Sequence, residues 1–309
     1  EDPPTSAPTK APTRTAIRVS ARVGRVPGRK LQASSTTVNF KITSGAASSL
    51  VNTYDLSGCT SSGGGFGDPH LKTWLGDVYD FHGQCDLVLV KSPSFANNLG
   101  LEIQIRTEIR HDWSFITEVA VSIGEEVMQI GSFASFSFNG VEGEKPDEKN
   151  ADLAELGGYP VHYSKIGTRG RRHRFDIDLG AKGKVVVRVY NEFLAVGIES
   201  GDSKDFYDSV GLMGNYSTGE LLDREGKLAT STTEFGLDWQ VRDTEKNLFK
   251  TLSGPQYPQL CVMPEAKDAR RRRKLESTKE YKKAAKACSN VAPEVLEPCI
   301  YGILGDIVN

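Results

Sequence analysis

Histidine is the residue type in this chain best suited to acid–base or metal chemistry near neutral pH. None of the histidines belongs to a His-Glu-x-x-His helix, and the chain has neither a Gly-x-Ser-x-Gly nucleophile elbow nor a phosphate-binding loop. We therefore expect a protein that is not an enzyme, with a hydrolase that lacks these motifs as the alternative. The five histidines are His70, His82, His111, His162 and His173.

Cysteine is the second residue type that could do chemistry. No two cysteines form a Cys-x-x-Cys pair, and no histidine stands near them at zinc spacing, which argues against a structural zinc site. An odd and sparse set fits either buried thiols or two disulfides with one cysteine left over. The five cysteines are Cys59, Cys85, Cys261, Cys288 and Cys299.

Three further stretches could carry a modification or a contact. Asn215-Tyr216-Ser217 is an N-glycosylation sequon, and a plain turn is the alternative role of this asparagine. Arg270-Arg271-Arg272-Arg273 predicts either a linker with solvated charges or a processing site for a secretory-pathway protease. The basic stretch at 169–174 predicts either a solvated loop or a contact with an anionic polysaccharide.

Composition narrows the class of protein. The chain has 309 residues, of which 38% are apolar, and a formal net charge of −2. No stretch approaches the roughly 20 consecutive apolar residues of a membrane-spanning helix. The charge balance gives no case for nucleic acid as a partner. The chain starts at Glu1 without a charged and then apolar leader, so we expect any signal peptide to lie outside it.

The elements that would position these residues are strands. Leu101, Ile103 and Ile105 alternate with polar residues, and 119–130 has the pattern of a hairpin with its turn at Gly124. Strands at short intervals with glycine, asparagine and aspartate between them predict an all-β antiparallel sandwich at 59–250. The other expected strands are 133–138, 161–166, 173–179, 184–190 and 193–198, and the acidic stretch 142–152 is expected to be a solvated loop.

The two ends have a different character. Residues 1–15 are rich in proline and threonine and predict a disordered stalk, and 16–58 predicts a partial β-module or hairpin. Residues 61–65 are expected to be a flexible lead-in. Residues 251–274 predict a linker with the basic run, and 275–309 a pair of helices. The first helix has a Ser277…Glu280 capping box, and a Cys288–Cys299 bridge would join the two helices.

Several motifs spread over residues 59–240 resemble the von Willebrand factor type D domain, including those in secreted proteins of diatoms. Gly67-Asp68-Pro69-His70 followed by Cys85 is similar to the opening of that family. Val210-Gly211-Leu212-Met213-Gly214-Asn215-Tyr216 resembles its Gly-Leu-Cys-Gly-Asn-Phe, and Phe235-Gly236-Leu237-Asp238-Trp239 resembles its closing Phe-Gly-x-x-Trp. The tail with Cys288 and Cys299 is similar to the start of the eight-cysteine module, with most cysteines missing.

The resemblance implies an extracellular protein with a particular set of bridges. Cys85 resembles the cysteine that pairs beyond the closing tryptophan, so a Cys85–Cys261 disulfide is implied. Met213 stands where the family has the partner of Cys59. Cys59 is then a buried thiol, or takes Cys261 from Cys85, or forms an intermolecular disulfide and thus covalent self-association.

The resemblance also raises a calcium hypothesis. Family members often bind Ca²⁺ in the loop after Gly-Asn-Phe, and Asn215 and Asp223 match acceptable oxygen ligands. Ser217 replaces a usual acid, and Leu75 stands where an aspartate is expected, with Asp77 as the nearest substitute. A turn without metal is the alternative, and no cofactor other than Ca²⁺ is expected.

Self-cleavage at Asp68-Pro69 is the second hypothesis that the resemblance implies. Some family members with Gly-Asp-Pro-His cleave themselves there, because the carboxylate can attack its own carbonyl and the proline amide is an easier leaving group. His70 is adjacent and titrates near neutrality. The alternative is a structural turn that enters a strand.

Taken together, these patterns predict a secreted or surface-displayed adhesion or matrix module. It would act without catalysis, by contacts with extracellular proteins or anionic glycans. A secreted carrier of lipid or another small ligand is an alternative that requires a sizeable apolar cavity, and a secreted hydrolase is another. Neither nucleic acid nor a transmembrane segment is expected.

Overall fold

The fold is seen in a computed structural model, which describes residues 60–66, 69–110, 113–146, 148–166, 172–180, 183–264, 278–289 and 300. The stalk at 1–15, the partial module at 16–58, the basic run 270–273 and the second C-terminal helix lie outside the described residues, except for Ile300. The limits predicted for the domains therefore stay predictions.

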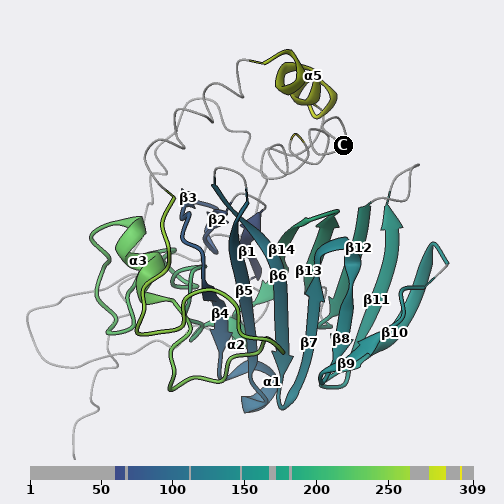
Figure 1. The fold of residues 1–309 in the computed structure, drawn as a ribbon. Coiled ribbons are helices and arrows are strands. Elements are labelled where there is room, and N and C mark those ends of the chain that lie inside the picture. Colours follow the sequence, from purple (N-terminus) through teal and green to yellow (C-terminus); the bar gives the residue numbers. More distant parts are fainter. Residues whose placement is uncertain are drawn as a thin grey trace, which may run out of the picture. The chain divides into compact units, whose positions relative to one another are not determined.

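The predicted all-β architecture is confirmed (Figure 1), and the larger of its two antiparallel sheets has eight strands. In spatial order these are β10 (Asn150–Leu156), β11 (Tyr159–Ile166), β12 (Arg172–Asp178), β13 (Lys184–Tyr190), β14 (Phe193–Asp202), β1 (Thr60–Phe66), β2 (His70–Lys72) and β3 (Val78–Asp80). A glycine turn joins β12 to β13, where Leu179 N donates to Gly183 O at 3.0 Å.

The second sheet has six strands in the order of the chain. They are β4 (Asp86–Ser92), β5 (Leu101–Arg110), β6 (Trp113–Ile123), β7 (Glu126–Gly131), β8 (Phe136–Phe138) and β9 (Val141–Gly143). The predicted hairpin is β6–β7, in which Ile123 pairs with Glu126 and Gly124 has a φ of 59°. Glycine tolerates this left-handed conformation because it has no Cβ.

The two sheets pack face to face as a sandwich. Phe136 of β8 packs against Phe175 of β12 with ring centroids 5.7 Å apart, and both belong to one continuous buried cluster. Ile103 and Ile105 of β5 point into this cluster, as their alternation predicted. The core is therefore built from alternate residues of both sheets.

Strand β1 corrects the prediction of a flexible lead-in at 61–65, which was wrong. Its residues pair with β14 on one side and β2 on the other, so a glycine run lies inside the larger sheet. A Cβ on Gly64 would lie 2.2 Å from Val196 O, so only glycine permits this approach of the two strands. The acidic stretch 142–152 was also only partly a loop, because Gly143 ends β9 and Asn150 begins β10.

The helical segments are short. They are α1 (Phe95–Asn98), a 3₁₀ turn (Ser132–Ala134), α2 (Ser203–Phe206), α3 (Thr232–Asp238) and α5 (Lys279–Ala287). The N-cap of α5 is Thr278, whose hydroxyl accepts from Tyr281 N at 3.1 Å, so the helix begins one residue later than the Ser277 box predicted. Ala284 and Cys288 are fully buried. No helix in the described part has the length and apolar character needed to cross a membrane.

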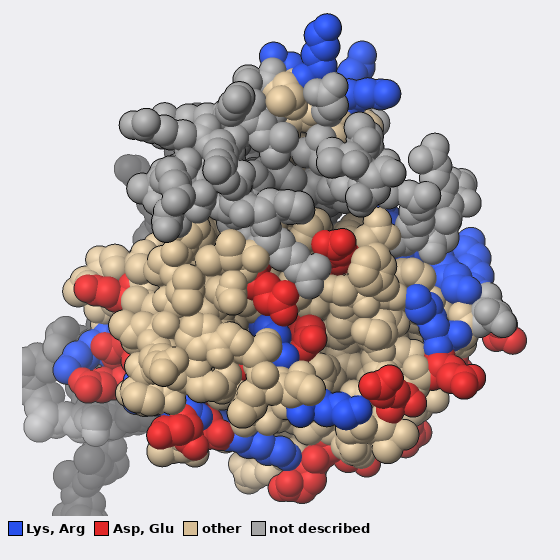
Figure 2. All heavy atoms as spheres, viewed as in Figure 1, with Lys and Arg blue, Asp and Glu red and all other residues tan. Residues whose placement is uncertain are grey.

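Acidic and basic side chains are interspersed among other residues on the face drawn in Figure 2. This mixing agrees with the small net charge of −2. On this face the described residues thus form no broad field of one sign of the kind that steers nucleic acid.

Candidate functional site

The motif stretches that carry the resemblance lie far apart in the chain but meet at β2, β3 and the turn between them. Trp74 N donates to Met213 O at 3.1 Å, and the Tyr79 hydroxyl donates to Leu212 O. Burial raises the pKa of Tyr79 well above its ordinary value of 10, so this phenol stays a neutral donor. The opening motif is thus tied to the Gly-Leu-Met-Gly stretch.

The closing motif packs against the same region around β2 and β3. A Cβ on Gly236 would lie 2.1 Å from the Phe81 ring. Only glycine therefore fits after Phe235 in the closing motif. Phe235 meets the ring of Tyr79 edge-on at 5.8 Å and that of Trp239 at 6.5 Å. Aromatic pairs in this arrangement contribute about 0.5–1.5 kcal/mol beyond the area they bury.

The turn after β2 is anchored by Trp74, whose side chain is 2% exposed. Its ring lies 5.2 Å from that of Phe206 and 5.0 Å from that of Tyr216. The Tyr216 hydroxyl donates to Gly201 O at 2.8 Å. We call this set of aromatic residues the motif core. It consists of Trp74, Tyr79, Phe81, Phe206, Tyr216, Phe235 and Trp239.

The outer edge of β4 is covered by the same two stretches. Val210 and Lys91 exchange backbone hydrogen bonds at 2.8 and 2.9 Å, and Leu212 N donates to Val88 O at 3.1 Å. Val88 N donates to Trp239 O at 2.9 Å. An exposed strand edge invites pairing with another chain, and here the motif stretches occupy it.

The expected Cys85–Cys261 disulfide is present, with Cα atoms 5.1 Å apart. Both cysteines are buried, and Gln84 N donates to Val262 O at 2.8 Å beside the bond. Stable disulfides are typical of oxidising compartments. Cys288 is also disulfide-bonded, but its partner lies outside the described residues, as do Cys59 and Cys299. The roles predicted for those two thus stay predictions.

Two of the predicted calcium ligands stabilise separate turns. Asn215 Oδ1 accepts from the backbone N–H groups of Ser217 at 2.9 Å and Thr218 at 3.0 Å. Asp223 Oδ1 accepts from Glu225 N at 2.9 Å and from Lys227 N at 2.8 Å. Such Asx turns hold a loop by local hydrogen bonds. These oxygens therefore have a structural role whether or not a metal is bound.

The other two predicted ligands belong to neighbouring turns. Asp77 lies in the turn closed by Thr73 N, which donates to Asp77 O at 2.9 Å, and Ser217 is exposed. A Cβ on Gly219 would lie 3.1 Å from the side chain of Leu75, so the two turns are adjacent. Among the described residues, no three His, Cys, Asp or Glu side chains gather closely enough to hold a metal. Calcium stays an untested prediction.

The self-cleavage motif is seen only in part. Asp68 lies outside the described residues, whereas Pro69 is buried and its carbonyl accepts from Phe81 N at 3.2 Å. His70 Nδ1 forms a hydrogen bond with the Asp80 carboxylate across β2 and β3. The Asp80 carboxylate beside the ring holds the imidazole in a fixed orientation. The attack geometry at Asp68 is not described, so cleavage stays a prediction.

Sequence reasoning missed a buried ionic cluster on the outward face of the six-stranded sheet. Arg106 of β5 is bidentate to Asp86 of β4, at 2.7 and 3.0 Å, and its Nη1 lies 3.0 Å from Glu118 of β6. The three residues form one cross-strand row. The side chains of Arg106 and Asp86 are only 2% and 3% exposed. Their burial could not be predicted from alternation, which places both on the polar face.

Burial and ion pairing together shift the pKa values of Arg106 and Glu118 in this cluster. Burial lowers the pKa of Arg106, but the hydrogen bond and charge of Asp86, with the charges of Glu118 and Glu108, outweigh it and leave that pKa raised. Burial raises the pKa of Glu118, and the positive charge of Arg106 offsets this only in part. The guanidinium thus stays charged and paired inside the cluster.

The cluster is buried because residues 239–262, here called the strap, run across this face (Figure 1). Arg106 Nη2 donates to Thr251 O at 2.7 Å, and its guanidinium lies 4.3 Å from the centre of the Phe249 ring. Gln104 binds the strap backbone twice, at Lys246 O and Leu248 N, each at 2.9 Å. Buried polar groups need such partners, and the strap supplies them.

A second arginine ties the strap to the closing motif. Arg224 is bidentate to Glu245, at 2.7 and 2.9 Å, and stacks 4.6 Å above the ring centre of Trp239. Burial raises the pKa of Glu245, but the hydrogen bonds and charge of Arg224, with the Arg242 backbone, lower it overall. Arg242 in turn binds Asp238 at 2.7 Å. These contacts hold the first part of the strap, and the Cys85–Cys261 bond holds its other end.

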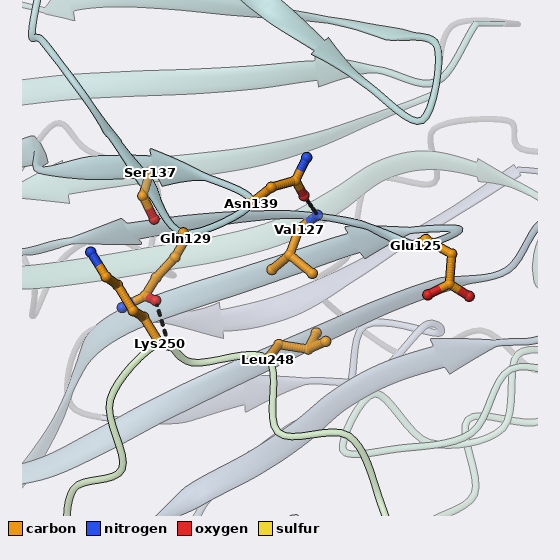
Figure 3. A pocket seen from close by; sticks show the side chains of 8 residues that line it. Glu125, Val127, Gln129, Ser137, Asn139, Leu248 and Lys250 are labelled. Carbon is orange, nitrogen blue, oxygen red and sulfur yellow. Dashed lines mark hydrogen bonds between the residues drawn. The ribbon is translucent and has the colours of Figure 1, made fainter.

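A shallow pocket of about 360 Å³ lies where the strap crosses β7 and β8. Figure 3 shows Val127 facing Leu248 at its floor, while Gln129 binds Lys250 N at 2.9 Å. Its charged lining side chains, Glu125 and Lys250, are exposed. The pocket thus has an apolar floor and a polar rim, without the convergent buried acids and bases of a catalytic cleft.

No protein-family model matches this chain, and no curated protein matches it.

Proposed function

We propose that this chain is an extracellular adhesion or matrix module of the von Willebrand factor type D kind. It would act without catalysis, by contacts with extracellular proteins or anionic glycans. The observation that carries this proposal is the motif core. Three stretches that resemble separate family motifs, around Trp74, Leu212 and Phe235, pack on one another although long segments of chain separate them.

The covalent closure of the sandwich supports the same proposal. The Cys85–Cys261 bond joins β4 to the end of the strap, and a bond of this kind persists outside the cytosol. The motif stretches cover the outer edge of β4, and the strap covers Gln104 and Arg106 on the outward face of the six-stranded sheet. Strand β4 therefore cannot pair with another chain through this edge.

A row of arginines on the eight-stranded sheet supports the anionic-glycan partner. Arg172 and Arg174 occupy alternate positions of β12, and Arg188 of β13 pairs with Arg174, so all three lie on one face. Arg172 lies over the ring of Tyr190 at 5.7 Å. Glu199 binds Arg188 at 2.8 Å and moderates the charge. Arginine suits sulfate and carboxylate groups because its forked donors can bind two oxygens of one group at once.

The first test is the fate of the full-length protein in its own cells. We expect it in the medium or at the cell surface, and we expect it to migrate faster on a non-reducing gel than on a reducing gel because Cys85–Cys261 closes a long loop. A cytosolic protein with both thiols reduced would contradict the proposal.

The second test is binding of the purified oxidised protein to immobilised heparin and to decellularised matrix. Replacing Arg172, Arg174 and Arg188 with glutamine should lower the salt concentration of elution from heparin. A control triple replaces lysines of other surfaces and should elute as the parent does, namely Lys204→Gln, Lys227→Gln and Lys246→Gln. Matrix binding that survives the arginine triple would indicate a protein partner, and no binding to either would contradict an adhesive role.

A further inference from the structure

The sequon Asn215-Tyr216-Ser217 lies in a tight surface turn directly beside the motif core. Gly214 and Gly219, at its two ends, have φ values of 71° and 69°. Asn215 N donates to Glu220 O at 2.9 Å, and Gly219 N donates to Asn215 O at 2.8 Å. The backbone on both sides of the asparagine is therefore fixed by hydrogen bonds.

The carboxamide of Asn215 uses only its oxygen in this turn. Oδ1 accepts from Ser217 N, from Thr218 N and from the Thr218 hydroxyl, at 2.9, 3.0 and 3.3 Å. Nδ2 donates to no acceptor within the described part of the chain. Glycosylation attaches sugar to Nδ2 and leaves Oδ1 as an acceptor. The turn and a glycan are thus compatible on the same side chain.

The rest of the sequon is arranged to leave this nitrogen at the surface. Tyr216 points inward, is 7% exposed and packs on Trp74. Ser217 is exposed, and its hydroxyl has no hydrogen-bond partner among the described residues. Asn215 itself is half-buried. The middle residue therefore anchors the tripeptide, while Ser217 faces solvent and Asn215 stays partly exposed.

We propose that Asn215 carries an N-linked glycan. The inference rests on the proposed extracellular function, because the modification occurs only in the secretory pathway. It also limits the adhesive surface: a bulky solvated glycan on the turn 214–220 keeps partners away from this side of the motif core. The partner-binding face would then lie elsewhere, for example on the arginine row.

The exposed hydroxyl of Ser217 allows a matched set of variants. Ser217→Ala destroys the sequon and removes no hydrogen bond, because the contact of Ser217 with Asn215 uses its backbone N–H. Ser217→Thr keeps the sequon. Asn215→Gln removes both the glycan and the short side chain that closes the turn, so it reports the structural role separately.

The experiment expresses the full chain with a secretory leader in eukaryotic cells and treats the secreted protein with a peptide N-glycosidase. We expect the parent and Ser217→Thr to gain mobility on treatment, with Asn215 converted to aspartate in the peptide mass spectrum. Ser217→Ala should be secreted, unchanged by the enzyme, and as stable to urea as the deglycosylated parent. Asn215→Gln should be unmodified and less stable.

An unmodified Asn215 in a secreted, disulfide-bonded parent chain would overturn this inference and leave the adhesive proposal intact. Enzyme-sensitive sugar that persists in Ser217→Ala would overturn it as well, because the modified site would then be another one. A different result would instead contradict the proposed function: the chain expressed with a secretory leader is glycosylated, but the natural protein does not reach the secretory pathway.

Discussion

Arg106 combines a positive charge with nearly complete burial. Its guanidinium satisfies Asp86, Glu118 and Thr251 O while it is 2% exposed. Burial of two charges costs several kcal/mol per ion, and only good geometry with further hydrogen bonds offsets that cost. The cluster is thus more a device that fixes the position of the strap than a source of net stability.

Arg106→Met should destabilise the protein by about 3–5 kcal/mol, because Asp86 is left buried without its positively charged partner, with Asn247 Nδ2 still donating to it. Asp86→Leu together with Arg106→Met should be less destabilised than the sum of the single variants. Urea unfolding under oxidising conditions measures each free energy. Arg188→Met breaks a more exposed pair and should lose less than about 1 kcal/mol. Additive single effects would show that Asp86 and Arg106 are not coupled.

His173 provides a pH dependence at the scale of one side chain. It is 8% exposed and bonds to the Tyr163 hydroxyl through Nδ1 at 2.7 Å. Burial, and then the charges of Lys145 and Lys165, lower the pKa of His173 below its ordinary value of 6.5. The unfolded chain therefore takes up the proton first. The stability from this group is complete above pH 6.5 and decreases as pH falls from 6.5 toward the folded pKa.

His173→Gln should reduce the loss of unfolding free energy between about pH 7.5 and about pH 5.5, since it removes the group that protonates on unfolding. Chemical unfolding at the two pH values gives the difference for parent and variant. His162→Gln is the matched control, because His162 is 45% exposed at the outer face of β11. An equal loss in His173→Gln and the parent would mean that other groups cause the acid sensitivity.

At the scale of elements, β1 shows how a strand can form without strand-forming side chains. Gly63, Gly64 and Gly65 follow one another in the middle of the larger sheet, although glycine weakens most strands. The reason is space: Gly64 lies against the backbone of β14, and a Cβ on Gly63 would lie 2.7 Å from the buried Met213 Cε. The strand is held by its two neighbours.

Gly64→Ala should destabilise the protein by about 1–3 kcal/mol or prevent folding, because the new Cβ would lie 2.2 Å from a backbone oxygen. Gly65→Ala is the control on the same strand. Its Cβ would meet the ends of the Leu71 and Ile116 side chains at 3.0 and 3.1 Å, and those ends can move. Thermal unfolding of both variants checks the order, and equal effects would argue against close packing of β1 on β14.

The strap is the element that changes the character of the smaller sheet. Without it, Gln104 and Arg106 would form an ordinary solvated face. With it, both are buried and each binds strap backbone. One segment thereby covers the centre of the outward face of the six-stranded sheet, so Gln104 and Arg106 are unavailable to a partner.

At the scale of the whole molecule, Cys85–Cys261 closes a loop with a sequence separation of 176. The loop-entropy model assigns such a closure about 5 kcal/mol, mostly through the unfolded chain. Replacing both cysteines with alanine should therefore lower the free energy of unfolding by several kcal/mol. Urea unfolding of the double variant, beside the parent with and without reductant, measures it. A double variant as stable as the oxidised parent would show that the strap is held by its polar contacts alone.

Alternation and turn chemistry were sufficient to predict the sandwich. The isoleucines of β5 and the Gly124 turn are local signals, since side-chain direction in a strand alternates residue by residue. The partner of Cys85 followed from a resemblance of motifs. Local signals failed at β1, where glycine indicated a loop, and at β10, where acidic residues indicated solvent.

The sequence by itself thus determined the all-β architecture and most strand positions. Only the tertiary structure decided which polar side chains are buried, that the motif stretches meet, and why three consecutive glycines belong in a sheet. The physical reason is that burial depends on what a distant segment places above a residue. The strap lies more than a hundred residues from Arg106, and no pattern within β5 records its presence.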